Sequence, residues 1–279
     1  MNLNNNRENY MKKFAVIGVG NMATSILNGM ISAQMPISDW IVYDKNDTQY
    51  TRLPERSGGY YYAKDIRDAV SLADCVLLSV KPQNFPKVLE EIRSTPRFDQ
   101  KLYLSIAAGI DSQAISAELN HAKVIRILPN LPMTIGMGVS LICENSAISH
   151  EDMEFARDIF SSSGSTVMIR ESEMNRMIGV TSSSPAYVFQ FINAIYQGAL
   201  AQGLADDCLI DTICDMVIGS AQLLKQQKTP PVELIARVAS KGGTTERALN
   251  VLEQRAFDEI IKDAMIACTE RADELGQKQ

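Results

Sequence analysis

Small residues stand at a fixed spacing after the first apolar run of the chain, in Gly18-x-Gly20-x-x-Ala23. This spacing, between a β-branched segment and a helical pattern, is typical of a turn that binds the pyrophosphate of a dinucleotide. Gly18 permits the tight turn, Gly20 lets the pyrophosphate approach the backbone, and Ala23 lets the helix pack on the strand. The helix from Asn21 to about Ala33 would aim its N-terminal N–H groups at the phosphates. The alternative is an ordinary strand–helix turn.

Asp44 ends the second apolar segment, about twenty residues beyond the glycine turn, where an acid commonly hydrogen-bonds the adenosine ribose. Lys45 and Asn46 follow it and could instead favour the 2′-phosphate of NADP(H). A third interpretation makes Asp44 only a cap of the next helix. The sequence leaves these alternatives open, and with them the choice between NADH and NADPH.

Three further strand ends carry residues that a cofactor could contact, because ligands of an open α/β sheet bind beyond the carboxyl ends of its strands. They are Val80-Lys81-Pro82, Ala107-Ala108-Gly109 and Asn130. The small residues would admit a flat ring, and Asn130 offers the donor and acceptor that a carboxamide needs. The alternatives are a solvated lysine, simple packing and a Pro-Asn turn.

A second candidate site follows in the C-terminal half, at Ser240-Lys241-Gly242-Gly243-Thr244-Thr245, just before a helical pattern. Such a turn presents backbone N–H groups and hydroxyls at a helix N-terminus, which suits a small carboxylate. A helix cap is the alternative. Another break, at residues 181–187, precedes a long amphipathic helix.

Composition narrows the class of protein. The net charge is −6 and no long basic run occurs, which argues against a nucleic-acid partner. No apolar stretch approaches a membrane span, and residues 1–11 are expected to be a polar, poorly ordered leader. The two histidines form no ligand pattern, so no metal is expected. The odd number of cysteines without C-x-x-C suggests reduced thiols in a cytoplasmic protein; they are Cys75, Cys143, Cys208, Cys214 and Cys268.

Alternating elements position the first set of residues. Strands are expected at 13–17, 40–43, 60–62, 75–80, 102–106, 123–127, 139–143 and 166–169, and helices between them at 63–72, 85–92, 112–119 and 151–161. This alternation predicts an α/β doubly wound, mostly parallel sheet of the Rossmann type over residues 12–170.

Beyond Arg170 the strand signal vanishes and apolar residues recur at helical spacing, for example Ile210, Ile213, Val217 and Leu224. Residues 171–279 are therefore expected to form an all-α domain. It has more apolar stripes than a lone domain of its size needs to hide, which favours a homodimer or a higher homo-oligomer through these helices.

Taken together, the motifs resemble those of the pyrroline-5-carboxylate reductase family, from about residue 12 to 275. The resemblance rests on six segments in this order: Gly18-Val-Gly-Asn-Met-Ala23, Val80-Lys-Pro-Gln83, Ala107-Ala-Gly109, Arg126-Ile-Leu-Pro-Asn130, Ser184-Pro-Ala-Tyr187 and Gly242-Gly-Thr-Thr245. It implies a Rossmann domain followed by a helical dimerisation domain. It also implies NADPH- or NADH-dependent reduction of 1-pyrroline-5-carboxylate to L-proline, the last step of proline synthesis.

The resemblance also implies the site residues. Thr245 matches the family threonine that faces the substrate amine, and we expect it to be catalytic. The expected substrate-binding set is Val238, Ser240, Lys241, Gly242, Gly243, Thr244 and Thr245. The expected cofactor-binding set is Gly18, Gly20, Asn21, Met22, Ala23, Asp44, Lys45, Val80, Lys81, Pro82, Ala107, Ala108, Gly109 and Asn130, with the nicotinamide between Ala107, Ala108, Asn130 and Ser184.

Three positions depart from the family pattern. Ser182 stands where the family often has glycine, Lys241 where it usually has proline, and Leu128 where it often has methionine. A reductase of another cyclic imine, such as a six-membered ring, therefore stays an alternative. So does a regulatory relative that binds the nucleotide without catalysis.

Overall fold

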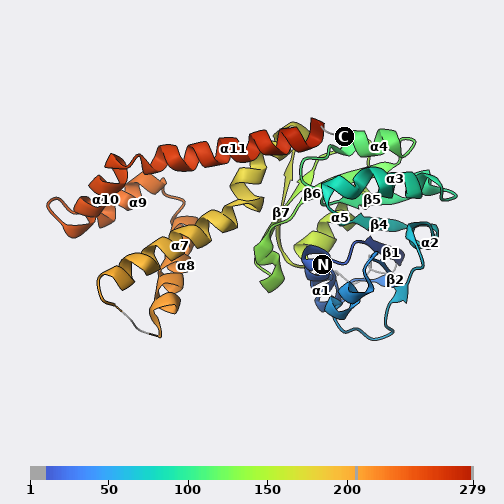
Figure 1. Ribbon diagram of the computed structural model, residues 1–279, viewed down its shortest axis with the longest axis horizontal. Helices are drawn as coiled ribbons and strands as arrows, with labels where there is room; N and C mark the ends of the chain where they lie inside the picture. Colours follow the sequence, from blue (N-terminus) through green and yellow to red (C-terminus); the bar gives the residue numbers. More distant parts are fainter. Residues whose placement is uncertain (1–10, 205–206, 278–279) are drawn as a thin grey trace, which may run out of the picture. The chain divides into compact units, whose positions relative to one another are not determined.

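The computed structural model describes residues 11–204 and 207–277, so the expected leader lies almost entirely outside the described residues (Figure 1). An eight-stranded sheet carries the N-terminal part of the chain, with the strand order β3-β2-β1-β4-β5-β6-β7-β8. All eight expected strands are present. Their bounds are β1 Lys12–Ile17, β2 Ile37–Tyr43, β3 Tyr61–Tyr62, β4 Cys75–Leu78, β5 Leu102–Ser105, β6 Lys123–Leu128, β7 Gly138–Cys143 and β8 Gly164–Ile169.

The sheet is mostly parallel, as expected. β1 pairs in parallel with both β2 and β4, and β6 pairs antiparallel with β7. The chain winds outward from β1 to β3 and then crosses back to β4 on the other side of β1. The carboxyl ends of β1 and β4 therefore form the switch point of the sheet, where open α/β sheets bind ligands.

Helices cover both faces of the sheet because the strand residues alternate between them. Phe14 and Val16 pack in one core with α1 (Asn21–Ser32) and α5 (His150–Ser161). Ala15 and Ile17 face the opposite core, which is closed by α2 (Ile66–Leu72), α3 (Phe85–Arg93) and α4 (Ser112–Glu118). Short 3₁₀ turns lie between these elements: η2 Asp47–Arg52, η3 Pro82–Asn84, η4 Phe98–Gln100 and η5 Leu131–Ile135.

The chain divides into two compact units. The first holds residues 1–183 and 268–279, and the second holds residues 184–267. The first unit extends past residue 170 because α6 (Glu171–Met177), the π-helical turn η6 (Ile178–Ser182) and the end of α11 (Phe257–Gln277) pack with the sheet. The residues that form this third core are Leu128, Leu141, Cys143, Met174, Ile178 and Ala272.

The second unit is entirely helical in its described part. It contains α7 (Ser184–Ala201), α8 (Leu209–Gln227), α9 (Pro231–Val238), α10 (Thr244–Gln254) and the first part of α11. Among its described residues, Ile213 is the only buried hydrophobic side chain. Large apolar side chains are exposed along its helices, including Phe189, Phe191, Met216, Val232, Ile235, Val251 and Ile260. No described helix combines the length and apolar character needed to cross a bilayer.

Candidate active site

The glycine turn between β1 and α1 uses its two glycines for different reasons. Gly18 has a φ of +94°, and a Cβ built there would lie 2.5 Å from the carbonyl oxygen of Ser79. Gly20 has a φ of −86°, which any residue adopts, and a Cβ built there would meet nothing within 4 Å. The fold therefore requires glycine at position 18, while position 20 borders open space.

That open space leaves room for the pyrophosphate that the sequence predicts at this turn. Gly20 is the N-cap of α1 and supplies no side-chain hydrogen bond to the first turn, so N–H groups at this end stay available to an anion. Ala23 is fully buried in the core between α1 and the sheet, as close helix–strand packing requires. Asn21 begins the helix, and its Oδ1 accepts a hydrogen bond from Arg52 at 2.6 Å.

Asp44 is tied to this turn. Its Oδ2 accepts the Val19 N–H at 2.8 Å, and its Oδ1 accepts the Asn46 N–H at 2.9 Å. Asn46, rather than Asp44, caps the following 3₁₀ turn η2, through a bond from the Thr48 N–H. The cap interpretation of Asp44 is therefore wrong, and its carboxylate lies beside the glycine turn at the end of β2.

The ends of β4 and β5 lie at the same edge of the sheet. Lys81 is exposed after β4, while Ala107 is buried after β5. Gly109 has a φ of +78°, and a Cβ built there would lie 2.8 Å from the carbonyl oxygen of Ala272 in α11. The small size of Gly109 is thus required for packing against α11, the alternative that the sequence had left open.

Asn130 is buried, and its side chain holds the end of β6 in place. Its Oδ1 accepts the Val139 N–H at 2.8 Å, and its Nδ2 donates to the Thr181 carbonyl at 3.2 Å. Ser182 donates to the Pro129 carbonyl at 3.3 Å and, in the π-helical turn, has no positive φ. The replacement of glycine by Ser182 therefore introduces no backbone strain.

The candidate substrate turn lies in the second unit, before α10. The Gly243 N–H donates to the Ser240 carbonyl at 2.9 Å, and Gly242 between them has a φ of +74°. This is the conformation of a type II turn, which favours proline but accepts other residues at its second position. Lys241 occupies that position and is exposed. The lysine is therefore compatible with the turn.

Two of the N–H groups expected to bind a carboxylate have partners inside the chain. The Gly242 N–H donates to Oε2 of Glu246 at 2.8 Å, and the Gly243 N–H belongs to the turn. The backbone N–H groups of Thr244 and Thr245 belong to the first turn of α10, where no carbonyl of the helix can reach them. Within the described part of the chain, the Thr245 hydroxyl has no hydrogen-bond partner. It therefore does not cap α10.

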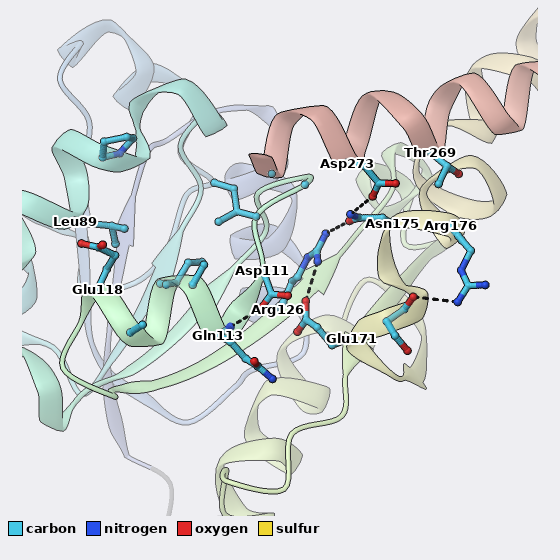
Figure 2. A pocket seen from close by; sticks show the side chains of 18 of the residues that line it. Leu89, Asp111, Gln113, Glu118, Arg126, Glu171, Asn175, Arg176, Thr269 and Asp273 are labelled. Atoms are coloured by element: carbon cyan, nitrogen blue, oxygen red, sulfur yellow. Dashed lines mark hydrogen bonds and ion pairs between the residues drawn. The ribbon is translucent and has the colours of Figure 1, made fainter. Parts of the chain in front are cut away.

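A cluster that the sequence reasoning missed surrounds Arg126, a charged residue within the apolar strand β6. Its side chain is 2% exposed, and its guanidinium donates to Glu171 at 2.8 Å and to Asn175 at 2.6 Å. Ser112 and Cys143 donate to the same carboxylate at 2.6 and 2.9 Å. Arg126 and Glu171 line a hollow of about 1170 Å³ between α3, α4, α6 and the end of α11. Figure 2 shows how these two side chains lie. An arginine inside a buried strand is the signal that could have predicted a buried acidic partner.

This cluster keeps Glu171 ionised. Burial raises the pKa of the Glu171 carboxyl, but the hydrogen bonds from Cys143, Ser112 and Arg126 and the charge of Arg126 outweigh it. The net pKa lies below the ordinary value. The cluster joins β6 to α6, and none of the residues predicted to bind substrate belongs to it. We therefore assign it a structural role. No group of acids, cysteines and histidines in the described residues could hold a metal ion.

Two protein-family models match parts of the chain. Residues 171–275 match pyrroline-5-carboxylate reductase dimerisation, and residues 13–109 match NADP oxidoreductase, coenzyme F420-dependent. The pyrroline-5-carboxylate reductase of Escherichia coli K12 is 33% identical over 95% of this chain and 99% of its own length. That of Synechocystis is 30% identical over 95% of this chain and 99% of its own length.

Solved structures agree in fold. A pyrroline-5-carboxylate reductase from Coxiella burnetii has a TM-score of 0.82 and 27% identity, covering 95% of this chain and 99% of its own. The Plasmodium falciparum pyrroline carboxylate reductase, solved with NADP bound, has a TM-score of 0.83 and 24% identity, covering 95% and 98%.

Proposed function

The chain belongs to the pyrroline-5-carboxylate reductase family, and on that basis we propose that it reduces 1-pyrroline-5-carboxylate to L-proline with NADH or NADPH. One observation carries the proposal beyond family membership. A single chain contains both a glycine turn open to a pyrophosphate and a Gly-Gly-Thr-Thr turn with an unbonded hydroxyl. Gly20 lies in the first of these turns and Thr245 in the second.

A nicotinamide held at the glycine turn would supply the hydride that reduces the carbon of the substrate C=N bond. The ring nitrogen, already protonated, would become the amine of the product, so the protein needs no strong acid or base. Its task is to position the ring and to match its charges. This requirement fits a chain with only two histidines.

We assign the substrate contacts to the turn before α10. The Thr245 hydroxyl would contact the ring nitrogen, and the N–H groups of Thr244 and Thr245 would bind the carboxylate. Lys241 would add a positive charge nearby. Glu246 now accepts the Gly242 N–H, so a substrate carboxylate can use that donor only after the Glu246 side chain moves.

The cofactor contacts are assigned to the glycine turn and to the strand ends beside it. Asn21, Met22 and Ala23 would lie along the pyrophosphate, and Lys81 would contact the nucleotide from the loop after β4. Asn130 would act chiefly by holding the end of β6 in place, since its Oδ1 is bonded to Val139 and its Nδ2 already donates to Thr181.

The chain forms a homo-oligomer through its helical unit. Large exposed apolar side chains on α7 to α11 support this assignment, because a lone unit would leave them in water. We further propose a cytoplasmic location. Its support is that none of the described cysteines is in a disulfide and that burial raises the pKa of the Cys75 and Cys143 thiols, as expected of reduced core residues.

The purified chain should be incubated with 1-pyrroline-5-carboxylate, or with a six-membered cyclic imine, and each reduced cofactor. Oxidation of the nicotinamide is followed by absorbance. We expect turnover of the five-membered ring to exceed that of the six-membered ring. Preference for the larger ring would favour the other cyclic imine reductase, and cofactor binding without turnover would favour the regulatory relative.

Thr245 gives the residue-level test. Thr245→Ala removes one hydrogen bond worth roughly 1–3 kcal/mol and should lower kcat/KM about 5- to 150-fold, with cofactor affinity unchanged. Thr245→Ser should recover most activity. Thr212→Ala, in the first turn of α8, is the matched control, because its hydroxyl bonds only the Cys208 carbonyl. A Thr245→Ala enzyme that is less stable but kinetically normal would refute the assignment.

A further inference from the structure

The Asp44 carboxylate is fixed beside the glycine turn. Each of its oxygens accepts one backbone N–H, from Val19 at 2.8 Å and from Asn46 at 2.9 Å. The Tyr50 hydroxyl bonds both the N–H and the carbonyl of Asp44, at 3.1 and 3.3 Å. Backbone and side chain are therefore both held, and the charge cannot swing away from an incoming ligand as that of an exposed acid could.

The polar residues around Asp44 are already committed or point elsewhere. Asn46 uses its Oδ1 to cap η2. Arg52 donates to Asn21, at the start of α1, where a pyrophosphate would lie. Arg56 lies over the rings of Trp40 and Tyr60, at 5.2 and 5.6 Å from their centroids.

The two lysines expected in the cofactor site do not form a rigid basic site. Lys45 is exposed and follows Asp44 directly, and Lys81 is exposed on the loop after β4. Asp47, the acid nearest in sequence, adds further negative charge at the start of η2. The one charge that the backbone holds in place at the end of β2 is therefore negative.

We propose that Asp44 makes this chain select NADH over NADPH. The proposal rests on the cofactor part of the proposed function and names which of the two cofactors the site favours. A ribose 2′-hydroxyl can donate a hydrogen bond to a carboxylate at this position. A 2′-phosphate cannot donate at neutral pH, and it brings roughly two negative charges toward a fixed third.

The test is equilibrium binding without the imine. The full-length protein is titrated with NADH and with NADPH by calorimetry, and the ratio of the two dissociation constants is measured. We expect NADH to bind about tenfold more tightly or better, because repulsion between charges a few ångströms apart near a protein surface is of that order. Equal affinities, or tighter binding of NADPH, would overturn the proposal in the native protein alone.

Variants locate the effect. Asp44→Asn keeps an oxygen that can accept the Val19 N–H but removes the charge, so it should shift the ratio about tenfold toward NADPH. Asp47→Asn removes the same charge three residues away, where no bond to the glycine turn exists, and should shift the ratio by less than about twofold. An equal shift in both variants would show a diffuse field and would contradict the role of Asp44.

A variant of Arg52 tests whether a nearby cation selects NADPH instead. If it serves the pyrophosphate, Arg52→Gln should weaken NADH and NADPH by the same factor. A loss confined to NADPH would identify Arg52 as a 2′-phosphate ligand and would overturn the proposal. These outcomes are separate from the proposed function. NADH preference without turnover of the imine would end the reductase assignment and leave the role of Asp44 standing, whereas active enzyme with equal affinities would do the reverse.

Discussion

Gly18 and Gly20 lie two residues apart in one turn, and the structure predicts opposite consequences when each is replaced. Gly20→Val places a β-branched side chain where a Cβ meets nothing within 4 Å, in a backbone conformation that valine adopts readily. Gly18→Ala places a Cβ 2.5 Å from the Ser79 carbonyl oxygen at a φ of +94°. The change at Gly20 should abolish cofactor binding, whereas the change at Gly18 should lower the stability of the fold.

The magnitudes follow from these contacts. At Gly18, the positive φ costs roughly 1–2 kcal/mol for a residue with a Cβ. The overlap with backbone that cannot rotate away costs about 1–3 kcal/mol more. The resulting fall in Tm is on the order of 10 °C for a unit of this size. At Gly20, the change in stability should stay within about 0.5 kcal/mol.

The loss of binding at Gly20 is estimated from the bonds it blocks. A pyrophosphate at this helix end would accept charge-assisted hydrogen bonds worth about 1.5–3 kcal/mol each. Losing two of them weakens binding more than about a hundredfold. Thermal unfolding and calorimetric titration with NADH, measured on the same preparations, would separate the two variants.

Two results would refute the reasoning. A Gly20→Val protein that binds NADH within about threefold of the native affinity would show that the open space is not the pyrophosphate site. A Gly18→Ala protein with an unchanged Tm would show that the approach of Ser79 does not constrain the turn.

Three further predictions concern assembly and the buried charges. Phe189→Ser, on the exposed face of α7, should weaken self-association about thirtyfold in sedimentation experiments. Val167→Ser removes an apolar side chain that is also exposed, in β8 of the first unit, and should leave self-association unchanged. A fully active native monomer would contradict the assignment. Arg126→Met leaves Glu171 charged and without its ion pair, and should cost about 3–5 kcal/mol at neutral pH by denaturant unfolding. The pKa of Glu171 in the native protein lies below its ordinary 4.5, so the ion pair contributes its full stability above pH 4.5 and loses that contribution as the pH falls. The difference in stability between the variant and the native protein should therefore narrow in acid. A difference that is independent of pH would argue against the pair. Asp152→Asn, which breaks contacts to Lys12 at 2.6 Å and Lys123 at 2.8 Å, should cost about 1–3 kcal/mol, whereas Asp39→Asn, in an exposed pair at 3.7 Å, should cost less than about 0.5; equal costs would show that burial of the pair is irrelevant.

The order of the strands and helices was predictable because its signals are local. Most strands are short apolar runs bounded by polar residues or glycine. Several first-unit helices begin at a recognisable cap or proline, as at Asp65 before α2 and Ser149 before α5. The glycine turn is also local, since its spacing and flanking elements lie within a few residues. These features indicated the doubly wound sheet and its ligand-binding edge without any knowledge of long-range contacts.

The boundary of the first unit was different. The change from strand to helix at residue 170 is a local signal, but α6 and the end of α11 join the first unit through side chains such as Met174 and Ala272, which meet the sheet only in three dimensions. Gly109 shows the same limit. Its sequence context suits a cofactor ring equally well. The structure explains the glycine by its φ of +78° and by the close approach of α11.

The sequence by itself determined which residues could do chemistry: the two glycines of the turn, Asp44 after β2 and the threonines before α10. Only the tertiary structure decided which hydrogen-bond and ion-pair partners the polar groups have. It bonded Asp44 to Val19, gave the Gly242 N–H to Glu246 and placed Arg126 against Glu171. The physical reason is that residue type and spacing encode local conformation. Which donor meets which acceptor depends on distant segments that the burial of apolar surface brings together. Such long-range pairs leave no repeating pattern in the sequence.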